Sequence, residues 1–131
     1  MQILVTYYSR TGTTEKLAEH VARGVRQVPG VDCLLKPCAE VTREHFLASD
    51  AVIVGSPVYF GSMAAELKTV LDGFNGIRNR MEGKIGAAFA TSHHSSGGKE
   101  TTLISIIQAM LIFGMIVVGD PMDAGGHYGV A

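Results

Sequence analysis

The chain has 131 residues, of which 47% are hydrophobic and 18% charged, and its formal net charge is −1. This composition indicates one globular domain over residues 1–131, and the near-neutral charge argues against nucleic acid or an anionic membrane as a partner. No stretch approaches the roughly 20 apolar residues of a membrane span, and the N-terminus does not look like a signal peptide. We therefore expect a cytoplasmic protein in which Cys33 and Cys38 are reduced.

Five apolar runs predict β-strands. They are nearly continuous in Val, Ile and Ala rather than alternating, as expected for parallel strands that are buried on both faces. The predicted strands cover Gln2–Tyr7, Asp32–Lys36, Ala51–Gly55, Ile85–Thr91 and Met115–Val118.

Helical patterns separate these runs. The second predicted helix is short and starts at Thr42 as its N-cap, and the third begins after Ser62. The fourth runs from about Lys99 to Phe113, where Gly114 is placed to cap its C-terminus. The first ends before Pro29-Gly30 and carries an apolar stripe at helical spacing, made by Leu17, Val21, Val25 and Val28.

Alternation of strands and helices is typical of a doubly wound α/β sheet, because right-handed crossovers place helices on both faces. With five strands, the flavodoxin-like order 2-1-3-4-5 is the natural choice. A helix normally closes such a sheet, but the glycines and the proline in residues 119–131 exclude a stable helix there. We expect this C-terminal helix to be missing. Either the native chain is longer, or one sheet face is partly uncovered and buried by a partner subunit.

The segment after the first strand, Ser9–Thr14, is rich in hydroxyls around one glycine and leads directly into a helix. Unpaired amides at a helix N-terminus attract anions, and the hydroxyls add donors, so the segment predicts a phosphate site. It contains neither GxxxxGK[ST] nor GxGxxG, which argues against a magnesium-nucleotide site or a tightly bound dinucleotide. A single phosphate monoester fits best. The alternative is an ordinary N-capped helix.

Two further loops reach the same edge of the predicted sheet, after the third and fourth strands. In the first of them, Tyr59 and Phe60 offer flat apolar faces that suit a planar heterocycle. Pro57 and Gly61 would fix this loop and let its backbone approach the ring. In the second, residues 92–98, two adjacent glycines would let the backbone pass the other side of the ring. A phosphate site beside a planar ring site indicates FMN, although the two aromatic residues could instead anchor the loop to the core.

Several segments resemble the flavodoxin-like family, and in particular NAD(P)H:quinone oxidoreductases of the WrbA type. The segment 7–15, YYSRTGTTE, looks like the FMN phosphate loop of flavodoxin-like proteins. The segment 55–72 is similar to the one that follows the third strand in the WrbA type, and residues 96–102, 113–119 and 125–129 continue the match. The insertion that such proteins often carry between the second and third strands is absent here. Ile112 and Phe113 stand where some members have histidines.

The resemblance implies tightly bound FMN, NAD(P)H as a transient co-substrate, two-electron transfer to a quinone or similar small acceptor, and a homo-oligomer, either a dimer or a tetramer. Carried over by position, the phosphate would be held by Ser9, Thr11, Gly12, Thr13 and Thr14, with Arg10 as a cation that screens it. The ring would be lined on one side by Pro57, Val58, Tyr59, Phe60 and Gly61, and on the other by Ser92, His93, Gly97 and Gly98.

Three residues are candidates for proton transfer to the acceptor. His93 or His94 could donate a proton near neutral pH, although a solvated loop is an equally good explanation for this pair. Adjacent histidines in an extended loop should point apart, and no third ligand is near in sequence, so we expect no metal site. Tyr128, together with His127, is a second candidate for the substrate pocket.

Two other functions compete with the enzyme. A one-electron flavodoxin carrier tends to be strongly acidic, whereas this chain carries a net charge of −1 and has no carboxylate in its three loops. A flavin-free interaction module would also suit a sheet without its closing helix. The intact hydroxyls and aromatic residues of the loops argue against that module.

Overall fold

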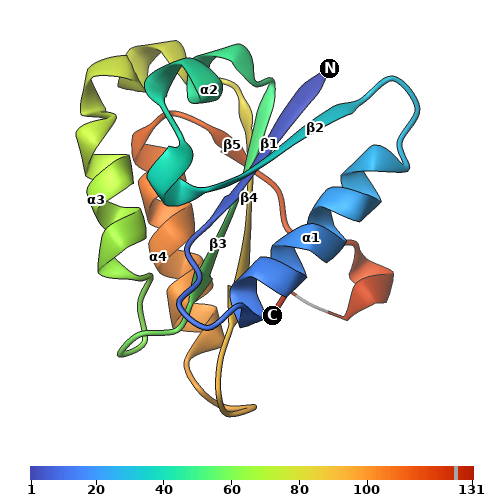
Figure 1. Cartoon of the computed structure of the whole chain (residues 1–131), viewed down its shortest axis with the longest axis vertical. Helices are drawn as coiled ribbons and strands as arrows, with labels where there is room; N and C mark the ends of the chain where they lie inside the picture. Colours follow the sequence, from blue (N-terminus) through green and yellow to red (C-terminus); the bar gives the residue numbers. More distant parts are fainter. Residues whose placement is uncertain (126) are drawn as a thin grey trace.

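The computed structural model describes residues 1–125 and 127–131. Its centre is a five-stranded sheet in the order β2-β1-β3-β4-β5, with every neighbouring pair parallel (Figure 1). The predicted fold class and strand order are therefore confirmed. The strands are β1 (Gln2–Tyr7), β2 (Asp32–Pro37), β3 (Ala51–Pro57), β4 (Ile85–Thr91) and β5 (Ile116–Val117).

Helices cover both faces of the sheet. Helix α1 lies on one face, and α3 and α4 lie on the other, with α2 beside them (Figure 1). The α-helices are α1 (Thr13–Arg26), α2 (Arg43–Ala48), α3 (Ala65–Gly73) and α4 (Lys99–Ile112). Short 3₁₀ helices follow β2, α3 and β5, namely η1 (Cys38–Glu40), η2 (Asn75–Arg80) and η3 (Met122–Ala124).

The predicted helix ends are confirmed in part. Thr42 caps α2, because its hydroxyl accepts the His45 N–H, and Gly114 follows α4 with a φ of 72°. Val28 does not belong to the buried stripe, since α1 ends at Arg26 and Val28 is exposed. The turn at Pro29-Gly30 ends the helix before Val28 can reach the sheet.

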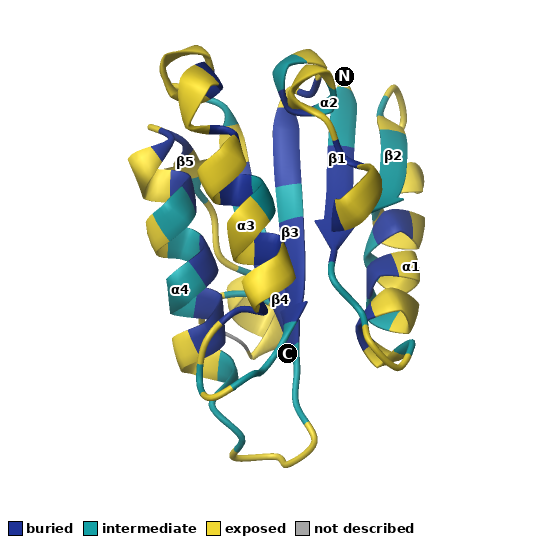
Figure 2. Ribbon diagram, turned by 60° about the vertical axis from the view of Figure 1, so that its left-hand side comes forward, coloured by how far each residue is buried: buried dark blue, intermediate teal, exposed yellow. Residues whose placement is uncertain are grey.

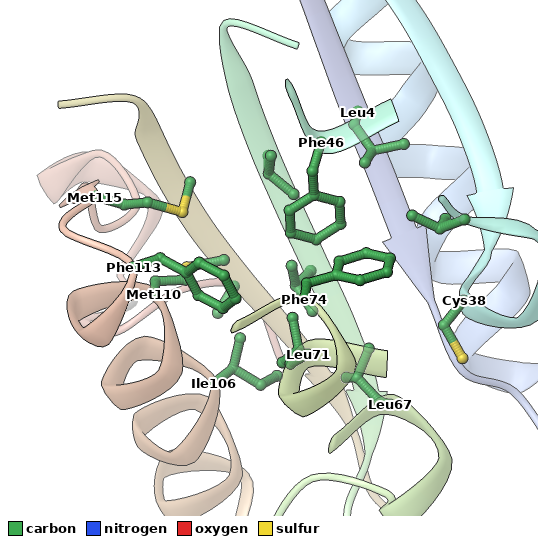
Figure 3. Close-up of a cluster of buried hydrophobic side chains, with 14 of the residues drawn as sticks. Leu4, Cys38, Phe46, Leu67, Leu71, Phe74, Ile106, Met110, Phe113 and Met115 are labelled. Atoms are coloured by element: carbon green, nitrogen blue, oxygen red, sulfur yellow. The ribbon is translucent and has the colours of Figure 1, made fainter. Parts of the chain in front are cut away.

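The larger core cluster fills the space between the sheet and helices α2, α3 and α4. At its centre, the ring of Phe46 lies 5.0 Å from that of Phe74 and 6.4 Å from that of Phe113, in edge and tilted contacts (Figure 3). The cluster beneath α1 is smaller, and the small side chains of Ala18 and Ala22 let α1 approach Phe89 closely. Buried residues concentrate on β1 and β3, while the outer faces of the helices are exposed (Figure 2).

The segment after β5 contains no α-helix within residues 118–125 and 127–131, as expected. It forms η3 and then returns to the sheet, where the Ala90 N–H donates to the Val130 carbonyl at 2.9 Å. Ile85 and Ile116, which lie on the α1 face by strand alternation, stay partly exposed. Gly126, part of the 125–129 match, lies outside the described residues.

Candidate functional site

Three loops meet at the carboxyl edge of the sheet, after β1, β3 and β4. The carbonyl of Thr91 accepts the Val58 N–H at 2.8 Å, which joins the end of β4 to the second loop. A Cβ placed on Gly98 would lie 3.3 Å from the Gly61 Cα, so the second and third loops touch through glycines. The structure thus brings together the segments 9–14, 56–62 and 92–98, as the topology predicts.

The first loop has the donor set that a phosphate monoester needs. Gly12 adopts a φ of 91° and precedes α1, and its N–H donates to the Ser9 Oγ at 3.1 Å. The first intrahelical bond runs from the Lys16 N–H to the Gly12 carbonyl, which leaves the amides of residues 13–15 without helical partners. Arg10, Thr11 and Thr13 are exposed around them, and a Cβ on Gly12 would meet no atom within 4 Å. This open, donor-rich cradle fits a dianion.

Thr14 differs from the other hydroxyl residues of this loop. It is 2% exposed, and its hydroxyl lies 2.8 Å from that of Thr91 on β4. Sequence reasoning placed Thr14 with the phosphate donors and did not select Thr91 at all. The two residues are 77 positions apart, and only the folded sheet shows that they form a pair.

The second loop is a tight turn. The N–H groups of Tyr59 and Ser62 each donate to the other residue's carbonyl, at 3.0 and 3.1 Å, while Phe60 and Gly61 have φ values of 50° and 75°. Positive φ at both central residues is the pattern of a type I′ turn. Phe60 is fully exposed at the tip, so it does not anchor the loop to the core. Tyr59 is half-buried and packs edge-on against Tyr8, with ring centroids 6.3 Å apart.

The third loop curls back on itself and carries both candidate histidines at the surface. Their ring centroids are 4.7 Å apart with an interplanar angle of 83°, so the expectation that His93 and His94 point apart is wrong. The Ser92 hydroxyl and the Gly97 N–H both donate to the His94 carbonyl, and this curl brings the two rings together. Within residues 1–125 and 127–131, no group of three His, Cys, Asp or Glu side chains forms a metal site.

Tyr128 and the two histidines do not line the same cavity. Tyr128 lines a cavity of about 420 Å³ at the start of α4, together with His127, Lys99 and Leu103. Neither His93 nor His94 lines this cavity. Of the three candidate proton donors, Tyr128 alone lines this cavity, and it comes from the C-terminal segment rather than from one of the three loops.

A contact that the sequence did not predict joins β1 to the first turn of α1. The Tyr7 hydroxyl donates to Glu15 Oε1 at 2.9 Å, and Tyr7 is 5% exposed. Burial, and then the hydrogen bond to the Glu15 carboxylate, raise the pKa of Tyr7 to about 12. This pair holds the helix N-terminus, and with it the phosphate cradle, against the strand.

The raised pKa of Tyr7 predicts a loss of stability in alkali. Between about pH 10, where the unfolded tyrosine ionises, and about pH 12, the native state binds the extra proton. The stabilisation, about 3 kcal/mol at most, is complete below pH 10 and is lost as the pH rises through 12. Urea unfolding across this range should show a downward slope that is shallower in Tyr7→Phe. An equal slope in Tyr7→Phe would show that other groups cause the loss of stability in alkali.

These loops, on a parallel sheet of order 2-1-3-4-5, define a flavodoxin-like α/β protein. The chain belongs to the NADPH-dependent FMN reductase family, whose sequence profile matches residues 1–127. The family takes its name from FMN, the flavin that the sequence predicted, and from NADPH, a nicotinamide reductant of the predicted kind. The prediction of FMN with a nicotinamide co-substrate is thus confirmed at the level of the family.

Two relatives match nearly the whole chain. An NAD(P)H dehydrogenase (quinone) from Solidesulfovibrio magneticus is 34% identical over 153 residues, covering 97% of this chain and 75% of that protein. A flavodoxin from Aquifex aeolicus is 38% identical over 133 residues, covering 98% of this chain and 72% of that protein. The chain is therefore similar both to an enzyme and to a flavodoxin.

Solved structures agree with this assignment. A flavodoxin from the domain Archaea matches with a TM-score of 0.79 at 30% identity, covering 92% of this chain and 80% of that chain. A WrbA-like flavodoxin from Agrobacterium tumefaciens matches with a TM-score of 0.75 at 23% identity, covering 88% and 74%. Together with the quinone dehydrogenase relative, they confirm the predicted resemblance to flavodoxin-like proteins of the WrbA type.

Proposed function

We propose that this chain is an FMN-dependent oxidoreductase that transfers two electrons from NAD(P)H to a quinone. The observation that supports it best is the meeting of three loops, in which an anion cradle lies at the same sheet edge as an exposed aromatic turn. FMN would supply the hydride and electron chemistry, and the protein would bind and orient it. The whole domain, residues 1–131, would serve as one FMN-binding unit.

The residues of the first loop would hold the phosphate. The amides at the start of α1 and the hydroxyls of Ser9, Thr11 and Thr13 offer donors to a dianion, and the helix dipole favours its charge. The exposed Arg10 would screen that charge from the solvent side. Thr14, which is buried beneath this loop, would contribute its hydroxyl, which also hydrogen-bonds with the Thr91 hydroxyl.

The second and third loops would hold the ring system. Phe60 presents an exposed flat face at the tip of its turn, and Gly61 and Gly98 let the two backbones come close. Either of the exposed histidines, His93 or His94, would donate a proton to the acceptor. Tyr128 would take part only if the acceptor extends to the cavity at the start of α4. The ring-lining set is Pro57, Val58, Tyr59, Phe60, Gly61, Ser92, His93, Gly97 and Gly98.

A one-electron carrier is the second candidate, because the Aquifex aeolicus relative is named a flavodoxin. The net charge of −1 favours the enzyme, since a carrier gains from negative charge around its flavin. None of the three loops contains a carboxylate that could supply such charge. A flavin-free module is supported least, because the cradle and the aromatic turn are both intact.

We also propose a cytoplasmic homo-oligomer, a dimer or a tetramer. Both cysteines, Cys33 and Cys38, are free, which suits a reducing compartment. None of the helices in residues 1–125 and 127–131 is long and apolar enough to cross a membrane. Exposed apolar side chains on the sheet, including Ile116 and Val118, would gain from contact with a second copy.

An anaerobic titration tests the proposed reaction. The protein is loaded with FMN and mixed with NADH or NADPH while the visible absorption of the flavin is followed. Rapid loss of the oxidised-flavin absorption, restored by benzoquinone, is the expected result. Flavin that stays oxidised with both coenzymes would contradict the enzyme and leave the carrier. Failure to bind FMN at all would leave the flavin-free module.

A further inference from the structure

Thr91, the last residue of β4, contacts the first and second loops of the candidate site and immediately precedes the third loop. Its hydroxyl lies 2.8 Å from that of Thr14 in the first loop, and its carbonyl accepts the Val58 N–H of the second loop at 2.8 Å. The third loop, residues 92–98, follows it directly in the chain. No other residue of β4 joins the loops in this way among the contacts of the described residues.

The hydroxyl pair restricts where each hydrogen can go. Thr14 is 2% exposed and lies in the first turn of α1, among the amides without helical partners. Two hydroxyls that share one hydrogen bond leave one hydrogen free. When Thr91 donates, the Thr14 hydrogen is free for an acceptor at the helix N-terminus. An anion there favours this arrangement, because a phosphate accepts hydrogen bonds and the helix dipole attracts it.

We propose that Thr91 is a positioning residue that acts through Thr14: its hydroxyl donates to the Thr14 hydroxyl and so directs the Thr14 hydrogen toward a flavin phosphate. The proposal rests on the proposed binding of FMN. The backbone carbonyl of Thr91 also accepts the Val58 N–H, which ties the second loop to the same residue. The phosphate cradle and the ring-binding loops are thereby coupled through one side chain and its own backbone.

The variant Thr91→Val tests the coupling, because it keeps the branched shape and the carbonyl and removes the hydroxyl alone. Dissociation constants for FMN and for riboflavin, which lacks the phosphate, are measured by quenching of flavin fluorescence. We expect FMN to bind severalfold more weakly, because the Thr14 hydroxyl keeps its own hydrogen but loses the donor that fixes its direction and strengthens its bond to the phosphate. Riboflavin should bind as before. The ³¹P resonance of bound FMN should shift in this variant, and Thr91→Ser should restore both the affinity and the resonance.

A double-mutant cycle shows whether the effect runs through Thr14. Thr14→Val should weaken FMN binding, and adding Thr91→Val in that background should weaken it no further. The matched control is Thr69→Val on α3, outside the three loops, where an exposed hydroxyl donates to the Ala65 carbonyl at 2.8 Å. This control should leave both dissociation constants unchanged. Thermal unfolding of each variant without flavin confirms that it is folded.

The possible failures are distinguishable. Wild-type protein that binds no FMN would overturn the proposed function and the coupling with it. Wild-type protein that binds FMN, with equal affinity in Thr91→Val, would overturn the coupling alone. Equal weakening of FMN and riboflavin would overturn it as well, since the hydroxyl would then support the whole site rather than the phosphate. Additive losses of FMN affinity in the Thr14→Val and Thr91→Val variants would also overturn the coupling.

Discussion

Replacing Gly55 with alanine is expected to destabilise the protein by about 3 kcal/mol, at the upper end for an overpacked core site. A Cβ at this position would lie 2.0 Å from two ring carbons of Phe89, which is 1% exposed. The buried ring has no room to withdraw, because α1 packs directly on it. Urea unfolding followed by far-ultraviolet circular dichroism measures the change.

Two variants separate this clash from other effects of adding a methyl group. Gly24→Ala on α1 meets no atom within 4 Å and should stabilise the protein by about 0.5–1 kcal/mol, because alanine favours a helix. In a Phe89→Leu background, the smaller side chain leaves room for the added Cβ, so Gly55→Ala should destabilise the protein much less. Gly55→Ala with an unchanged unfolding midpoint would mean that the sheet shifts to accept the Cβ.

Replacing Gly12 with valine is expected to weaken FMN binding at least tenfold. Gly12 has a φ of 91°, which a β-branched residue adopts only at a cost of about 1–2 kcal/mol or more. Relief of this strain would turn the amides at the start of α1 away from a common point. Riboflavin, which does not use the cradle, should bind nearly as before. Fluorescence titrations with both flavins measure the two affinities.

Gly30 provides the matched control for this variant. It has a φ of 77° and open space around it, but it lies in the turn between α1 and β2, away from the loop edge. Gly30→Val should therefore lower stability by a similar amount and leave the FMN affinity unchanged. Equal losses of FMN affinity in both variants would show that Gly12 acts through global stability alone.

The fold could be predicted because its main determinants are local. Two of the strands, β1 and β4, have the predicted bounds, and Thr42 caps α2 as its sequence context indicates. Errors occur at the ends of elements. The last turn of the first helix is one case, since Val28 has no buried surface to meet once the chain turns at Pro29-Gly30.

The positions of the three loops followed from topology, because parallel strands all end at one edge. The contacts within them did not. The pairs Thr14–Thr91 and Tyr7–Glu15 depend on side-chain directions across packed elements, and the first of them joins residues 77 positions apart. The rings of His93 and His94 meet because of hydrogen bonds within a curled loop, which periodicity does not report.

The return of the C-terminal segment to the sheet has a consequence for how the protein behaves in concentrated solution. β5 pairs with β4 only at Ile85 and Gly86, so the outer edge of β4 beyond them would otherwise present free backbone groups. Val130 occupies that edge, where its carbonyl accepts the Ala90 N–H. An unpaired strand edge is a template for strands of other molecules. The C-terminal segment thus protects the edge of β4 from pairing with other molecules. Variants in which this segment detaches from β4 should aggregate more readily, while the three loops of the candidate site stay intact.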